Sequence, residues 1–177
     1  RKLSEQTPKA HRGEFNNTYQ TIERFTGVLE HDGKVLKHGR NVVKTTLTPL
    51  MYGSALETSI NSMANKLIEN VYERIEKAAN GENTETAAEI VDDINALIEQ
   101  GSGVSLLSSA LSLDQLLETE LAEDQIEAIK AAFHGTLGRA VRTTIKENFS
   151  EYLTQRDNFN RVAQVTFDLY DSVYKGL

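Results

Sequence analysis

One short segment places four side chains that could bind a nucleotide at every fourth position: Arg40, Lys44, Thr48 and Tyr52. If the segment is helical, this spacing puts them in a slowly drifting stripe along one side of the helix. Two cations one turn apart can bind a polyphosphate, with arginine acting as a fork and lysine as a point charge. The tyrosine lies about 12 Å beyond the lysine along the helix axis, within reach of a base on which its ring could stack.

Gly53 follows the tyrosine and allows the chain to turn sharply or a nucleic-acid backbone to come close. The same spacing also fits an ordinary amphipathic helix with two solvated cations and a half-buried Tyr52. Spacing alone leaves both interpretations open.

Other residue types that carry chemistry form no recognisable motif. The four histidines are His11, His31, His38 and His134, and no two of them have the i, i+4 spacing of a helical zinc site. His31 and Asp32 are better explained as a solvated turn than as an acid–base pair. The chain has no cysteine, which excludes disulfides, thiolate zinc sites and iron–sulfur clusters. The glycine-rich phosphate loops and the GxSxG elbow are absent as well, and we predict no metal site in the chain.

The segment from Arg40 to Gly53 resembles motif B of the single-subunit polymerases, which include the phage and mitochondrial RNA polymerases and the family A DNA polymerases. That motif is an arginine, three residues, a lysine, seven residues and Tyr-Gly, and the chain reproduces it without a gap. The resemblance implies that Arg40 and Lys44 bind the incoming triphosphate, and that Lys44 protonates the pyrophosphate leaving group. It also implies that Tyr52 helps to select ribose and that Gly53 ends the helix near the templating base.

Two residues depart from the usual motif. Thr48 stands where the family usually has methionine or phenylalanine, and Pro49 should interrupt and kink the helix because it removes a backbone hydrogen bond. These departures favour a divergent phage RNA polymerase, of the kind carried in virions, over the fingers of a family A DNA polymerase.

The resemblance also implies catalysis by Mg²⁺ ions held by two aspartates, one far upstream and one far downstream of motif B. The 39 residues before Arg40 leave no room for the first, so we expect the ions to be bound by residues outside this chain. The implied partners are a nucleoside triphosphate, a DNA template and the remaining polymerase segments or subunits. The implied location is the host cytoplasm or the virion.

The elements that must position this motif are almost all helical, so we predict a mainly α, fingers-like subdomain with one short β-hairpin near residues 28–36. Apolar stripes with helical spacing run through residues 54–81, 86–101 and 123–153, and we interpret them as core. A bend is expected where Gly135 and Gly138 weaken the third helix. Three capping boxes mark expected helix starts, at Ser54 and Glu57, Thr86 and Glu89, and Ser112 and Gln115. Thr154 and Asp157 suggest the start of a final helix, whose apolar stripe is also interpreted as core.

We expect residues 1–13 to form a tail or linker and residues 14–177 to form a single helical domain, with a mobile loop at 101–109. The chain begins at Arg1 without an initiator methionine, which suggests a processed product or a fragment. No apolar run approaches 18 residues, so no membrane span is expected.

Charge is distributed unevenly along the chain. Residues 1–52 carry a net charge of +4 and residues 53–177 a net charge of -11. The stretch 82–127 contains 12 acidic residues and no lysine or arginine. A nucleic acid would therefore be attracted to the first third of the chain and repelled from the rest.

Two classes of function stay open at this point. The chain is either the fingers segment of a nucleotidyltransferase, unable to polymerise alone, or a helical interaction module without enzymatic activity. In the second class, the acidic stretch 82–127 would be the surface that binds a basic partner.

Overall fold

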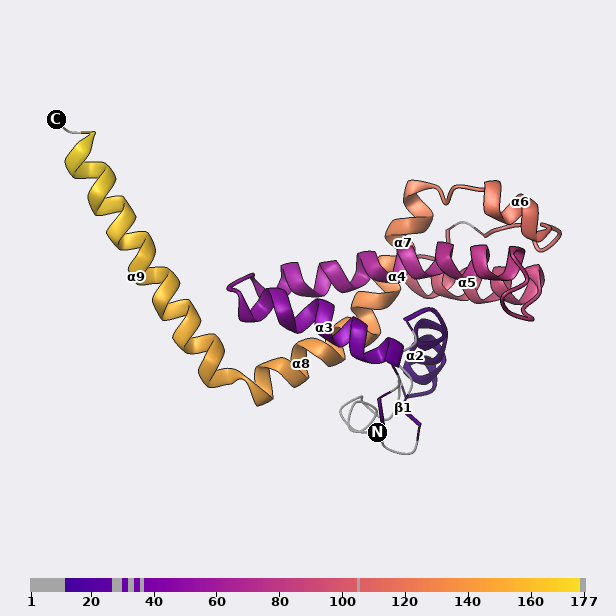
Figure 1. Ribbon diagram of the computed structural model, residues 1–177, viewed down its shortest axis with the longest axis horizontal. Helices are drawn as coiled ribbons and strands as arrows, with labels where there is room; N and C mark the ends of the chain where they lie inside the picture. The colour runs from indigo at the N-terminus through magenta and orange to yellow at the C-terminus, as the bar shows by residue number, and fades with distance from the viewer. Residues whose placement is uncertain (1–11, 27–29, 32–33, 36, 105, 176–177) are drawn as a thin grey trace. The chain divides into compact units, whose positions relative to one another are not determined.

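The computed structural model describes residues 12–26, 30–31, 34–35, 37–104 and 106–175 of the chain. The protein is mainly α, as predicted (Figure 1). Its helices are α2 (Arg12–Thr26), α3 (Lys37–Met51), α4 (Leu56–Ala79), α5 (Ala87–Gly101), α6 (Leu113–Glu118), α7 (Glu123–Phe133), the π-helix η2 (His134–Gly138), α8 (Arg139–Asn148) and α9 (Ser150–Tyr174). None of the described helices combines the length and apolarity needed to span a bilayer.

The expected hairpin is present as two very short strands, β1 (Glu30–His31) and β2 (Lys34–Val35). They pair antiparallel, with Glu30 opposite Val35 and His31 opposite Lys34. The predicted turn residues Asp32 and Gly33 lie outside the described residues.

The chain divides into two compact units, residues 1–140 and residues 141–177. The single domain expected over residues 14–177 stays a prediction. In the expected tail, residues 1–11 lie outside the described part of the chain, and α2 begins at Arg12.

The core of the first unit forms around α4. The apolar stripe predicted for this helix is buried along its whole length, at Leu56, Ile60, Met63, Leu67, Val71 and Ile75. Helix α5 adds Ile90, Ile94, Leu97 and Ile98, as the sequence pattern predicts. Helix α3 lies beside α4 and is joined to it by the turn at residues 52–55 (Figure 1). One central helix therefore packs against helices on several sides.

Helices α5 and α7 approach each other unusually closely where α5 ends. A Cβ atom placed on Gly101 would overlap the backbone carbonyl of Ala128 on α7. Glycine is required at this position because any side chain would push the two backbones apart.

Two of the three predicted capping boxes are confirmed. The Thr86 hydroxyl accepts from the backbone N–H of Glu89, and the Glu89 carboxylate accepts from the N–H of Thr86 at 2.9 Å. Ser112 and Gln115 repeat this reciprocal pattern at the start of α6. The box predicted at Ser54 is wrong, because the N-cap of α4 is Ala55.

The long helix predicted over residues 123–153 is interrupted twice. At the expected weak point, the backbone widens into the π-helix η2, in which the Thr136 hydroxyl donates to the carbonyl of Ala132 at 2.7 Å. The second break is at Phe149, with φ of -126° and ψ of 22°. Helix α9 therefore begins at Ser150 and continues through Thr154, so the helix start predicted at Thr154 is wrong.

The apolar stripe of α9 is not core. No residue of this helix is buried, and Phe159, Leu169 and Tyr170 are exposed. Its helical period was predicted, but helical period alone does not reveal whether a partner covers the apolar face.

Replacing Gly101 by alanine should destabilise the first unit by about 3 kcal/mol, because the added methyl group meets a backbone carbonyl that cannot rotate away. Urea unfolding followed by circular dichroism measures the loss. Gly135→Ala is the matched control, since a Cβ at that position meets nothing within 4 Å; its effect should stay below about 1 kcal/mol. Equal stability of the two variants would contradict the close α5–α7 contact.

Candidate functional site

One face of helix α3 packs against α4 and holds the helix in place. Thr46 and Leu50, one turn apart, are both buried. The Thr46 hydroxyl donates a hydrogen bond to the sulfur of Met63 on α4 at 2.9 Å. This face therefore packs on α4 and fixes which way the opposite face of α3 points.

The opposite face carries the predicted binding residues. Lys44 is two residues before Thr46 and so lies about 200° around the helix from it, and Lys44 and Thr48 are exposed. Tyr52 is 87% exposed, which contradicts a half-buried tyrosine. The structure thus brings Lys44, Thr48 and Tyr52 to one open side. Arg40 lies on the same helix, but its side chain is outside the described part of the chain.

The Tyr-Gly pair ends the helix by a Schellman motif. The N–H of Gly53 donates to the carbonyl of Leu50 at 3.2 Å, and the N–H of Ser54 donates to that of Pro49 at 3.0 Å. Gly53 has φ of 96°, a left-handed conformation that favours glycine. Tyr52 is therefore the C-cap residue, and its place beyond the last turn follows from the backbone geometry.

Pro49 does not interrupt α3. It lies within the last turn, and the helix continues to Met51. The carbonyl of Pro49 accepts from the N–H groups of both Tyr52 and Ser54. The expectation of an interruption is wrong because a proline this close to a helix end removes one hydrogen bond while its carbonyl still serves the cap.

The electrostatics of this face suit an anionic ligand. The Lys44 side chain is exposed, and no carboxylate among the described residues pairs with it. Nor do the described residues include any group of three or more histidine, aspartate or glutamate side chains placed to hold a metal.

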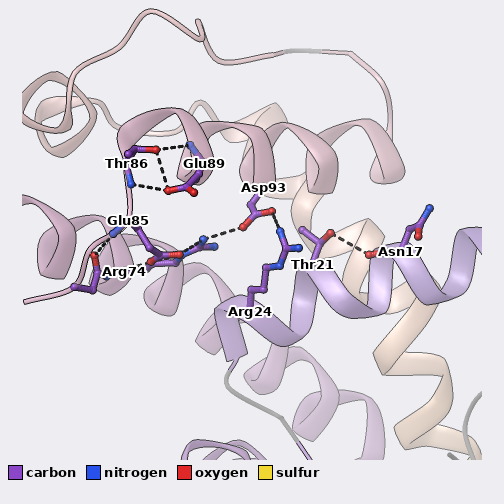
Figure 2. A network of polar contacts seen from close by, with 9 residues as sticks. Asn17, Thr21, Arg24, Arg74, Glu85, Thr86, Glu89 and Asp93 are labelled. Atoms are coloured by element: carbon purple, nitrogen blue, oxygen red, sulfur yellow. Dashed lines mark hydrogen bonds and ion pairs between the residues drawn. The ribbon is translucent and has the colours of Figure 1, made fainter.

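A second polar cluster, which sequence reasoning missed, lies around Arg74 on α4 (Figure 2). The Arg74 guanidinium donates from Nε to both carboxylate oxygens of Glu85, at 3.0 and 2.9 Å, and from Nη2 to Asp93 at 2.8 Å. Arg24 on α2 pairs with the other oxygen of Asp93. The side chains of Arg74 and Asp93 are only 11% and 9% exposed. The cluster connects α2, α4, α5 and the loop before α5.

The chemistry of this cluster is structural. Burial disfavours the charge of Arg74, but hydrogen bonds to Glu85 and Asp93 outweigh that effect and raise its pKa. Its guanidinium carbon lies 4.5 Å from the ring centroid of Phe25 on α2. Nearby, the pKa of Glu89 is lowered mainly because its carboxylate accepts a hydrogen bond from the backbone N–H of Thr86. A second hydrogen bond, from the Thr86 hydroxyl, lowers this pKa further. The charges of Arg74, Arg24, Glu85 and Asp93 are already compensated by one another.

A polar depression of about 510 Å³ lies between α4 and the α7–η2 segment, lined in part by Asn61, Asn65 and His134. Lys130 also lines it but pairs with Glu127 at 2.9 Å. The exposed face of α3 is thus better suited to bind an anion than this depression.

The described chain is a mainly α segment, and one face of its helix α3 exposes a lysine and a tyrosine. Residues 2–177 match the family described as the helical domain of bacteriophage N4 RNA polymerase, and the chain belongs to this family. No significant match was found among curated proteins or among solved structures. The match confirms the prediction of a segment related to phage RNA polymerase.

Replacing Arg74 by methionine should lower the free energy of unfolding by about 3 kcal/mol, because Glu85 and the buried Asp93 lose a cation. Chemical denaturation measures the loss. The matched control is Lys66→Met on the same helix, whose pair with Glu69 is solvent-exposed and should contribute less than about 1 kcal/mol. Similar losses in the two variants would show that the Arg74 cluster does not organise the unit.

Proposed function

We propose that α3 and the turn after it act as motif B of a DNA-directed RNA polymerase, in a fingers segment that binds the incoming ribonucleoside triphosphate and the template. The observation that carries this proposal is the single exposed face formed by Lys44, Thr48 and Tyr52 and ended by Gly53. Family membership supports the RNA polymerase branch over the DNA polymerase branch.

The basic end of the face would bind the triphosphate. In this proposal Arg40 and Lys44, one helical turn apart, neutralise phosphate oxygens as charge develops during nucleotidyl transfer. Lys44 donates a proton to the pyrophosphate oxygen as its bond to the α-phosphorus breaks, so that a less charged group leaves. The Lys44 side chain is exposed, and no carboxylate of the described residues pairs with it, which favours its approach to that oxygen.

The other end of the face would hold the sugar and the template. Tyr52 projects its ring into solvent beyond the last turn, where it can pack on the nucleotide while its hydroxyl senses the ribose 2′-hydroxyl. A Cβ atom at Gly53 would meet nothing within 4 Å, so a templating base could come close to the backbone at this point.

The departures from the usual motif are compatible with this geometry. Thr48 is exposed between Lys44 and Tyr52, where a polar side chain costs nothing in packing. Pro49 lies in the last turn, where it can rigidify the helix end. We retain the proposal that the polymerase is a divergent one of the virion-carried kind, acting in the host cytoplasm or packaged in the virion.

Mg²⁺ in this proposal is bound by polymerase segments outside this chain, because the resemblance implies two metal-binding aspartates that lie far upstream and far downstream of motif B. When bound, the ions would stabilise the charge of the transferring phosphoryl group. The contribution of this chain is to bind and orient the nucleotide and to move a proton at Lys44.

In the intact polymerase, Lys44→Ala should reduce the rate of ribonucleotide addition about 100-fold or more, because both a phosphate contact and a general acid are lost. Template-directed extension with Mg²⁺, with ribo- and deoxyribonucleotides side by side, measures the effect. Lys66→Ala removes another cation, from α4, and should leave the rate unchanged. Normal extension by a folded Lys44→Ala protein would favour the interaction-module alternative.

Tyr52→Phe should lower the preference for ribonucleotides about tenfold while deoxyribonucleotide addition is retained, because a hydroxyl that reads the sugar is lost. The ratio of kcat/KM for the two nucleotide types is the measurement. The control is Tyr72→Phe, which loses a hydroxyl that accepts from the N–H of Leu121 at 3.2 Å; stability should fall without any change in selectivity. Unchanged discrimination by Tyr52→Phe would remove this role from Tyr52.

A further inference from the structure

Helix α9 exposes an unusually large apolar surface. Eight of its large apolar side chains are exposed: Phe159, Val162, Val165, Phe167, Leu169, Tyr170, Val173 and Tyr174. At about 100° per residue they cover an arc of about 200°, more than half of the helix circumference. A surface of this kind on a folded chain indicates an interaction site.

The polar side of α9, by contrast, carries side-chain pairs between residues four positions apart. The Gln164 amide donates to the carboxylate of Asp168 at 2.8 Å, and Lys175 pairs with Asp171 at 2.6 Å. The apolar arc is therefore the side of α9 that calls for a partner.

A second copy of the chain would cover only part of this arc. Phe159, Thr166 and Val173 recur every seven residues, and Val162 and Leu169 occupy the position three residues after the first two of them. These are the a and d positions of a two-stranded coiled coil. Phe167 and Tyr174 then fall at b positions, outside such a seam, although each is 63% exposed. Tyr170 stacks on Tyr174, with ring centroids 4.3 Å apart, and extends the aromatic surface in that direction.

We propose that the apolar arc of α9 docks into an apolar groove, formed by at least two elements, on the remaining segments of the same RNA polymerase. A groove can cover both the a/d seam and the flank formed by Phe167 and Tyr174, which a single partner helix cannot. The occupant follows from family membership, because α9 lies inside the matched residues 2–177 of a polymerase domain. This inference rests on that membership and is independent of the role proposed for Lys44.

Thiol labelling tests the proposal directly, because the chain has no cysteine of its own. Single cysteines are introduced as Val162→Cys on the seam, Phe167→Cys on the flank and Asp168→Cys on the polar side. Each is labelled with a small maleimide, both in the intact polymerase and in the isolated chain at low concentration, and the modified peptides are quantified by mass spectrometry. Circular dichroism confirms that each variant retains its helix content.

In the intact polymerase, the cysteines at positions 162 and 167 should label about tenfold more slowly than the one at 168, because docking must open before the reagent reaches them. In the isolated chain all three should label rapidly. Equal labelling in the polymerase would overturn the proposal. Concentration-dependent protection of position 162 but not 167 in the isolated chain would assign the arc to a second copy. Protection of both positions in the dilute isolated chain would show that the chain covers the arc itself.

The outcome is also separable from the proposed nucleotide binding. Loss of activity in Lys44→Ala with an unprotected α9 would retain motif B and reject the docking. Normal activity in Lys44→Ala with a protected α9 would reject motif B and retain the docking.

Discussion

The structure of the first unit depends on the buried charge of Arg74. A guanidinium in this position must be neutralised and hydrogen-bonded, since an unpaired buried charge costs several kcal/mol. Glu85 in the loop before α5 and Asp93 on α5 neutralise it and accept hydrogen bonds from its Nε and Nη2, and Arg24 of α2 shares Asp93 (Figure 2). These bonds are directional, and they therefore select one arrangement of α2 and α5 on α4, where apolar packing alone would tolerate several.

The candidate binding face on α3 is positioned by α4, the helix that carries Arg74. Met63 receives the hydrogen bond from Thr46 in the same helix that carries Arg74, and Leu50 is buried one turn beyond Thr46. Because one face of α3 is fixed on α4, the orientation of the exposed face is fixed as well. The Schellman motif at Gly53 then places Tyr52 by backbone hydrogen bonds. The residues proposed to bind the nucleotide are thus positioned by the buried face of α3 and by α4.

Local features of the fold could be predicted from the sequence, and long-range ones could not. The buried stripe of α4, the capping boxes at Thr86 and Ser112, the hairpin and the weak point at Gly135 and Gly138 all depend on residues a few positions apart. The Arg74 cluster joins residues 24, 74, 85 and 93, whose spacing follows no local rule. The exposure of α9 depends on partners that a helical period does not encode. For the candidate site, the order of the residues along the helix could be predicted, but the exposure of Tyr52 and the continuation of α3 past Pro49 required the structure.

The contact between Gly101 and Ala128 also has a consequence for how the gene can change. Every amino acid other than glycine carries a Cβ atom, so no missense change at codon 101 is conservative in the physical sense. A substitution there would need a compensating shift of the α7 backbone, which a second side-chain change cannot readily supply. Codon 101 should therefore remain fixed while the exposed codons around it drift, and a variant library of this chain should be depleted at this position before any exposed position of α5.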